Sequence, residues 1–135
     1  MEVNYKSQIM RLIRGYWKTI IICIGILYAS LNHTPGIALP TFVGADKWMH
    51  GLMYAVLGCA ICWESSAMHV QGWKKWMIAL GFPVIFGGFI EILQETWFPP
   101  RSGDWMDWVA DCAGAIVGWG VVVIFKRIRT CKQNG

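Results

Sequence analysis

Long apolar stretches alternate with short polar breaks along this chain. Four stretches contain no charged residue, and they cover residues 19–45, 48–63, 76–90 and 112–125. A helix needs about 20 residues to cross a bilayer, and three of these stretches are shorter than that. They reach spanning length only if the helices continue through the acidic residues at their ends. We therefore expect four spans, over roughly residues 16–32, 46–68, 76–98 and 104–125.

The breaks and the composition agree with this reading. Proline and glycine in the breaks at residues 32–36 and 99–103 favour turns. Of the 135 residues, 56% are hydrophobic and only 15% are charged, which is more apolar surface than a soluble domain of this size can bury. The sequence predicts an all-α fold, an integral membrane four-helix bundle that forms a single domain over residues 1–135.

Basic residues are distributed unequally between the two ends of these spans. One side carries ten Lys and Arg residues with two acidic ones, whereas the other has Lys47 and Arg101 with six acidic residues. Because cytoplasmic loops are enriched in Lys and Arg, both termini are expected in the cytoplasm, in a multi-pass protein of the bacterial inner (cytoplasmic) membrane. The basic residues form separate clusters beside the spans, which predicts membrane lipids as partners and no nucleic acid.

Six of the eight acidic residues lie inside or at the edges of the last three spans. An ionisable group at membrane depth is costly unless it is paired or hydrated, so such a cluster predicts a functional site. Helical spacing places the polar residues of each span on one face, and the three faces should turn inward together. We expect an acidic pocket open to the extracytoplasmic side, with these candidate ligand-binding residues: Asp46, Lys47, His50, Tyr54, Glu91, Gln94, Glu95, Arg101, Asp104, Asp107 and Asp111.

Some of these residues could have a purely structural role. His50 could serve as an interhelical hydrogen-bonding group, while Tyr54 and Gln94 could pack behind the site. Gly114 and Gly118 continue the acidic face of the fourth span as a seam of small residues, which would let a neighbouring helix approach closely. Five charged residues are near enough to the interface to be simply solvated: Asp46, Lys47, Glu95, Arg101 and Asp104.

Three short motifs in this region resemble the VanZ-like family of small membrane proteins. They are Asp46-Lys47-Trp48-Met49-His50 with Tyr54 and Gly58, then Glu91-Ile92-Leu93-Gln94, then Arg101-Ser102-Gly103-Asp104 with Asp107, Gly114 and Gly118. The resemblance implies a four-helix protein of the cell envelope whose best-known relative contributes to teicoplanin resistance, and it implies no known reaction. The family pattern tends to have Asn where this chain has Asp111, which adds a negative charge or a shared proton.

Three classes of function stay open, and binding of a lipid-linked or cationic envelope ligand is favoured. Lys47 and Arg101 would hold a phosphate or carboxylate, and the acids would receive amines. The second class is a membrane hydrolase or transferase acting on a lipid-linked envelope precursor. Its catalytic residues would be His50 as base and Glu91 or Asp107 as orienter, and it would use an activated water. The third is a proton-coupled transporter, which would require a homo-oligomer.

No metal ion or other cofactor is predicted. His50 is a single histidine among carboxylates and lacks the spacing of a zinc motif. The alternative is a divalent ion, for which nitrogen and oxygen donors are present: His50, Glu91, Glu95, Asp107 and Asp111.

Overall fold

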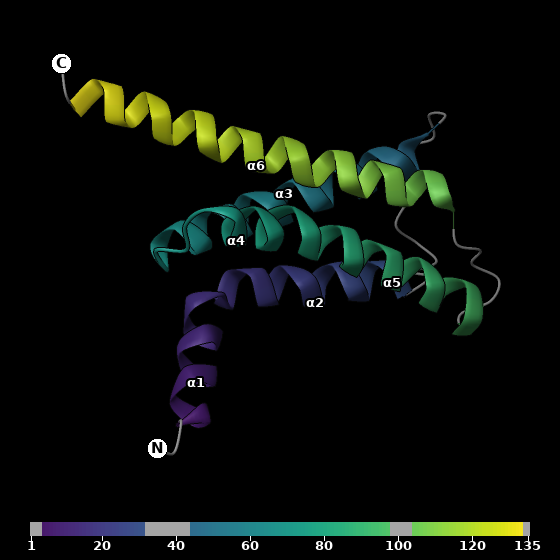
Figure 1. Ribbon diagram of the computed structural model, residues 1–135. Helices are drawn as coiled ribbons and strands as arrows, with labels where there is room; N and C mark the ends of the chain where they lie inside the picture. Colours follow the sequence, from purple (N-terminus) through teal and green to yellow (C-terminus); the bar gives the residue numbers. More distant parts are fainter. Residues whose placement is uncertain (1–3, 32–43, 98–103, 134–135) are drawn as a thin grey trace.

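The protein is built from helices (Figure 1). The structure, a computed structural model, describes residues 4–31, 44–97 and 104–133. Every element in this part of the chain is helical, which confirms the all-α prediction. The elements are α1 (Tyr5–Gly15), α2 (Trp17–Leu31), α3 (Ala45–Ala67), α4 (Trp73–Trp76), the π-helical turn η1 (Met77–Gly81), α5 (Phe82–Trp97) and α6 (Trp105–Gln133).

Within the described residues, two helical segments are long and apolar enough to cross a membrane. They are Trp73–Trp97, which joins α4, η1 and α5, and Trp105–Gln133, which is α6. The pair α1 and α2 qualifies as a third only if the two helices are taken as one bent span. The expectation of membrane-spanning helices is thus confirmed for two of the four predicted spans. The four-helix bundle and the cytoplasmic termini stay predictions.

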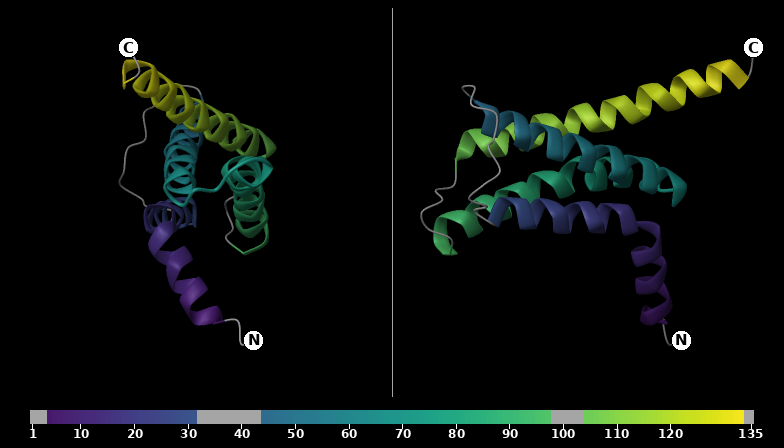
Figure 2. Two further views of the ribbon diagram at one scale, coloured as in Figure 1. Left: turned by 60° about the vertical axis from the view of Figure 1, so that its left-hand side comes forward. Right: turned by 180° about the vertical axis from the view of Figure 1, so that it is seen from behind.

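Helix α3 has 23 residues but is not among the candidate spans. It carries Asp46, Lys47 and Glu64, which lower its apolar character. Figure 2 shows α3 between α6 and α2 in both views. Its side chains Lys47, His50 and Glu64 form polar contacts with residues outside α3. A helix in this central position can carry buried polar groups because its neighbours supply their partners.

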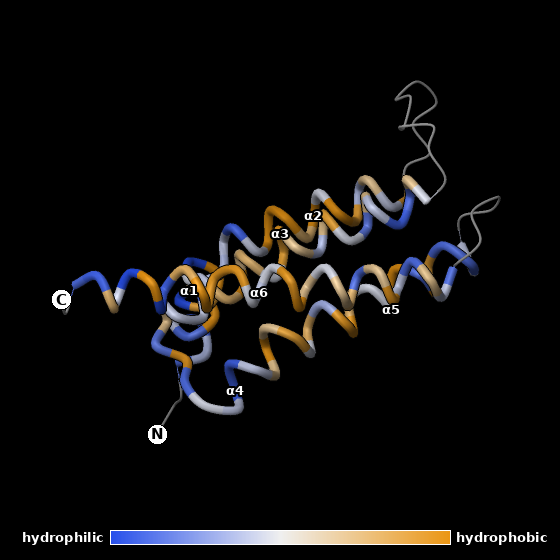
Figure 3. The backbone as a smooth tube through the Cα atoms, turned by 90° about the horizontal axis from the view of Figure 1, so that it is seen from above, coloured by the Kyte–Doolittle hydropathy of each residue, from blue (hydrophilic) through white to orange (hydrophobic). Residues whose placement is uncertain are grey.

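Helix α6 is longer than the span predicted for it. Helix α6 continues to Gln133, eight residues beyond the predicted end at residue 125. Its last turns are basic, and Figure 3 shows that the part of α6 near the C-terminus is mostly hydrophilic. The predicted span ends where the charged residues begin, but the helix itself can continue beyond the membrane. Residues 32 and 98, the predicted ends of the first and third spans, lie outside the described residues.

Helix α1 was not predicted. It is bent by 71° from α2 and stands apart from the other helices in Figure 1. None of its residues is buried. The side chain of Asn4 accepts a hydrogen bond from the Ser7 N–H at 3.3 Å, which satisfies one of the free donors at the start of the helix.

Helices α3 and α6 form the most extensive helix pair. A side chain at Gly114 would collide with the Gly51 carbonyl oxygen, and one at Gly118 would collide with the carbonyl oxygen of Ala55. This contact confirms the predicted small-residue seam. Only glycine lets the two backbones approach this closely, and the pairing determines which polar side chains of α3 and α6 can meet.

Candidate functional site

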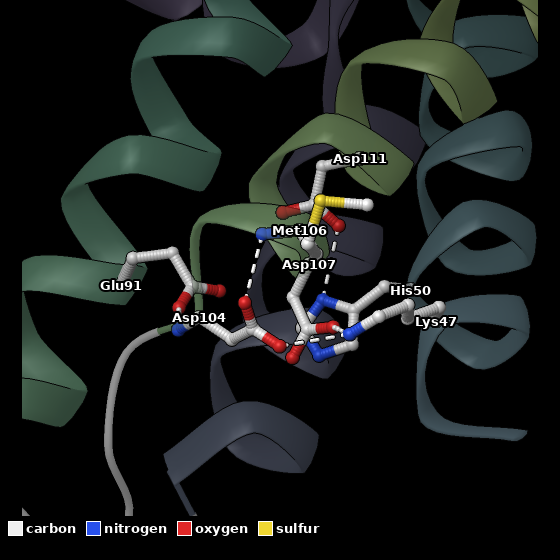
Figure 4. A network of polar contacts seen from close by, with 7 residues as sticks. All are labelled: Lys47, His50, Glu91, Asp104, Met106, Asp107 and Asp111. Atoms are coloured by element: carbon white, nitrogen blue, oxygen red, sulfur yellow. Dashed lines mark hydrogen bonds and ion pairs between the residues drawn. The ribbon is translucent and has the colours of Figure 1, made fainter. Parts of the chain in front are cut away.

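Polar side chains from three helices converge where α3 and α6 begin (Figure 4). Helix α3 supplies Lys47 and His50, and α5 supplies Glu91. Asp104 precedes α6, which itself supplies Asp107 and Asp111. We call these six residues the polar cluster. The structure therefore brings together six of the candidate ligand-binding residues that helical spacing predicts from the sequence.

Lys47 joins α3 to the beginning of α6. Its Nζ donates hydrogen bonds to Asp104 Oδ2 at 2.8 Å and to Asp107 Oδ1 at 3.1 Å. The hydrogen bond from the Lys47 ammonium holds the pKa of the Asp104 carboxyl below its usual value, and the Met106 N–H, 2.9 Å from Asp104 Oδ1, acts in the same direction. Lys47 is therefore already engaged by two carboxylates.

His50 and Asp111 form a buried pair one helical turn deeper. His50 Nδ1 lies 3.0 Å from Asp111 Oδ1, and the two side chains are only 4% and 1% exposed. The structure thus places Asp111 against His50, rather than Glu91 or Asp107. Asp111 is the position where the resemblance suggested Asn, and here its carboxylate can orient the imidazole or share its proton.

Glu91 approaches the polar cluster from α5. Its Oε2 accepts the Asp104 N–H at 2.8 Å, whereas its buried Oε1 has no hydrogen-bond partner among the described residues. One donor atom each from His50, Glu91 and Asp111 lie within 4.8 Å of one another. These atoms could hold a cation, and so could a second group formed by Asp46, His50 and Asp107.

A groove of about 490 Å³ lies between α5 and α6, beside the polar cluster. Trp108 spans the two helices by donating a hydrogen bond from Nε1 to the Val84 carbonyl oxygen at 2.9 Å. Among the described residues, the groove wall has two carboxylates, those of Glu91 and Glu95. The other described lining residues are Gly88 and the apolar residues Val84, Ile85, Phe89, Ile92, Trp105 and Trp108. The hollow that adjoins the cluster is therefore mainly apolar, and the acidic pocket expected from the sequence stays a prediction.

Comparison with known families agrees with the sequence motifs. The family model described as VanZ/LLP1 matches residues 10–126, which is most of the chain. The chain belongs to the VanZ family. No curated protein and no solved structure matches it. The matched region contains the whole polar cluster and the groove beside it.

Other predicted site residues of this VanZ-family protein are not members of the polar cluster, although the Asp46 carboxylate lies within 4.8 Å of donor atoms of His50 and Asp107. Gln94 is buried and donates a hydrogen bond from Nε2 to the Ser30 carbonyl oxygen at 2.8 Å, which ties α5 to α2. Asp46 and Glu95 are exposed. Tyr54 is fully buried beneath His50 on α3. Arg101 lies outside the described residues.

Sequence reasoning missed one buried carboxylate of this VanZ-family protein, which lies outside the polar cluster. Glu64 of α3, counted from the sequence as a cytoplasmic charge, is only 4% exposed. Its Oε1 accepts the Lys18 N–H at 3.0 Å, and its Oε2 accepts the Thr19 N–H at 3.1 Å and the Thr19 hydroxyl at 2.7 Å. Glu64 therefore caps α2 from a neighbouring helix. The only sequence signal is an acid within α3 and a threonine near the start of α2.

Proposed function

We propose that this protein binds an amphipathic, lipid-linked ligand of the cell envelope in the groove between α5 and α6. The apolar part of the ligand would lie along the groove wall, and its polar head would reach the polar cluster. One observation carries the proposal. The groove is apolar along its wall and yet adjoins Glu91, whose buried Oε1 has no partner among the described residues.

The chemistry of the groove matches an amphipathic ligand. Apolar surface buried against a hydrocarbon chain favours binding by about 25 cal/mol per Å². A buried carboxylate oxygen without a partner costs about 1–3 kcal/mol or more, and a hydrogen-bond donor or a cation that arrives with the ligand would remove that cost. The two requirements meet at Glu91.

Lys47 has a smaller part in this proposal than the sequence suggested. It was expected to hold a phosphate or carboxylate together with Arg101. In the structure its ammonium already donates to Asp104 and Asp107, so an anionic headgroup would have to compete with two carboxylates for it. The headgroup would therefore bind at Glu91, either through its own hydrogen-bond donors or through a cation, rather than at Lys47.

The cellular setting is also part of the proposal. The excess of basic residues on one side supports an orientation in the bacterial cytoplasmic membrane with the polar cluster facing outward. Membership of the VanZ family supports a ligand of the cell envelope, and a contribution to glycopeptide resistance would follow if that ligand were an envelope precursor.

A second candidate function is a membrane hydrolase or transferase acting on the same ligand. It is favoured by the buried His50–Asp111 pair, in which the carboxylate could orient the imidazole as a general base for an activated water. His50→Gln should then abolish turnover of a lipid-linked substrate while its binding in the groove persists. Loss of binding in the same variant would instead assign His50 to recognition.

Native mass spectrometry of the detergent-purified protein tests the binding proposal. Gly88 faces the groove, where an added Cβ would lie 3.4 Å from Trp108 Nε1. Gly88→Leu should therefore lose the lipid species that copurifies with the wild type. Gly25→Leu is the matched control, because Gly25 lines a different apolar groove, between α2 and α3, whose described lining residues include no charged one. Equal occupancy in the two variants would contradict the proposal.

A further inference from the structure

The polar cluster and its surroundings contain more carboxylates than cations. Among the described residues, Lys47 is shared by Asp104 and Asp107. His50 can carry at most one positive charge, and it already contacts Asp111. Glu91 is left without a positively charged partner in this part of the chain, although one of its oxygens is buried. Uncompensated charge at such a site is costly, so a proton or a bound cation should neutralise it.

We propose that His50, Glu91 and Asp111 bind a divalent cation. Each residue comes from a different helix, namely α3, α5 and α6. Their donor atoms lie within 4.8 Å of one another, which is close enough for a single ion to contact all three. Imidazole nitrogen with two carboxylate oxygens is a donor set suited to transition ions such as Mn²⁺ and Zn²⁺.

A buried hydroxyl points to the same place. The Tyr54 side chain is only 1% exposed, and its hydroxyl has no hydrogen-bond partner among the described residues. A Cβ built at Gly87 would lie 3.3 Å from that hydroxyl and 2.8 Å from Asp111 Oδ2. The hydroxyl therefore lies close to the Asp111 oxygen that is not bonded to His50. An oxygen bound to the cation would give the Tyr54 hydroxyl the acceptor it lacks.

The second possible donor group, formed by Asp46, His50 and Asp107, is less suited to the ion. Asp46 is exposed, and Asp107 is 3.1 Å from the Lys47 ammonium. A divalent ion beside that ammonium would meet a like charge. The buried group is farther along α3 and α6 from Lys47, and its Glu91 oxygen is free to bind.

The cation would take part in binding the proposed ligand, and its role there rests on the proposed function. Glu91 is both a member of the donor group and part of the groove wall, so the ion would face a headgroup bound there. Divalent ions held by one or two carboxylates commonly complete their coordination with phosphate oxygens. The cation would thus let an acidic site receive a lipid-linked phosphate or pyrophosphate.

Binding of Mn²⁺ to the purified full-length protein, measured by electron paramagnetic resonance after EDTA treatment, tests the cation site. We expect one Mn²⁺ per chain, with a ¹⁴N coupling in the pulsed spectrum that His50→Gln removes. Glu91→Gln and Asp111→Asn should each weaken Mn²⁺ binding by more than about tenfold. Asp46→Asn removes the same charge from the other donor group and should change the affinity by less than about twofold.

Thermal unfolding of each variant, measured in parallel, shows whether it is folded, and Tyr54→Phe gives a milder perturbation of the same site. Absence of stoichiometric Mn²⁺ binding to the wild type would overturn the cation site. So would an affinity that Glu91→Gln and Asp111→Asn leave unchanged, or a greater loss in Asp46→Asn. Gly88→Leu separates the two proposals, since it should lose the lipid and keep Mn²⁺. If Mn²⁺ binds and no lipid copurifies with the wild type, the cation site stands and the ligand proposal fails.

Discussion

His50 of α3 and Asp111 of α6 contact each other in the protein interior, with 3.0 Å between Nδ1 and Oδ1. The pair joins the two helices that pack most extensively. Interhelical hydrogen bonds in membrane proteins contribute on average about 0.6 kcal/mol and up to about 1.7 kcal/mol. A buried pair of this kind belongs to the upper part of that range.

A double-mutant cycle measures this coupling. His50→Ala, Asp111→Ala and the double variant should give a coupling free energy of about 1–1.7 kcal/mol in reversible unfolding in detergent. Asp111→Asn should lose less stability than Asp111→Ala, because the amide can still accept or donate at the imidazole. Additive effects of the two alanine substitutions would show that the contact contributes nothing to stability.

The glycine seam between α3 and α6 should be intolerant of a single methyl group. Gly118→Ala would place a Cβ against the Ala55 carbonyl oxygen, so the helices must separate, and we expect a loss of about 1–3 kcal/mol. Gly120→Ala is the matched control on the same helix, because a Cβ there meets no atom within 4 Å. It should be neutral or stabilising by up to about 1 kcal/mol through helix propensity. Equal effects of the two substitutions would refute close packing at Gly118.

Glu64 should matter for the stability of α2. Removing its carboxylate with Glu64→Ala leaves two backbone N–H groups and the Thr19 hydroxyl without their acceptor, at a cost of about 1–2 kcal/mol. Thr19→Val removes one of these hydrogen bonds and should cost less. Thermal unfolding compares the two variants, and a Glu64→Ala protein as stable as the wild type would show that the cap is dispensable.

The Lys47–Asp104 contact predicts a pH dependence with a defined sign. Because the folded-state pKa of Asp104 is lowered, its contribution to stability is present above the ordinary carboxyl value of 3.8 and is lost as the pH falls through the folded pKa. The melting temperature of Asp104→Asn should therefore lie below that of the wild type near neutral pH. The gap should narrow below about pH 4. A gap that widens on acidification would contradict the assigned direction.

The polar cluster could be predicted from the sequence because helical spacing alone defines faces. Spacings of three and four residues place Asp104, Asp107 and Asp111 on one face, and the same rule places His50 on a face with Asp46, with Lys47 at its edge. The choice of partner could not be predicted. Whether His50 meets Asp107, Asp111 or Glu91 depends on the axial offset of α3 and α6, which the backbone contact at the glycine seam determines.

Three other features could not be predicted from the sequence, each for a different physical reason. Gln94 shares a helical face with Glu91, yet the rotation of α5 directs it to the Ser30 carbonyl oxygen of α2. Helix α1 has apolar residues at helical spacing, including Ile9 and Leu12. Basic residues lie between them, so this helix forms no uncharged stretch of the kind that predicts a span. Glu64 counts as a cytoplasmic charge in the sequence. Its burial could not be predicted, because its three hydrogen-bond donors belong to α2 and local sequence patterns do not show contacts between helices.

The lipid occupancy of Glu91→Gln, measured by native mass spectrometry, tests most directly whether the groove and the polar cluster form one ligand site. Glutamine keeps the size of the side chain but removes the charge that a donor or a cation would neutralise. We expect this variant to lose the lipid species that Gly88→Leu also loses, while Glu95→Gln, which alters an exposed carboxylate of the same wall, reduces its occupancy less. A wild-type level of that lipid in Glu91→Gln would show that the groove and the polar cluster are not one ligand site.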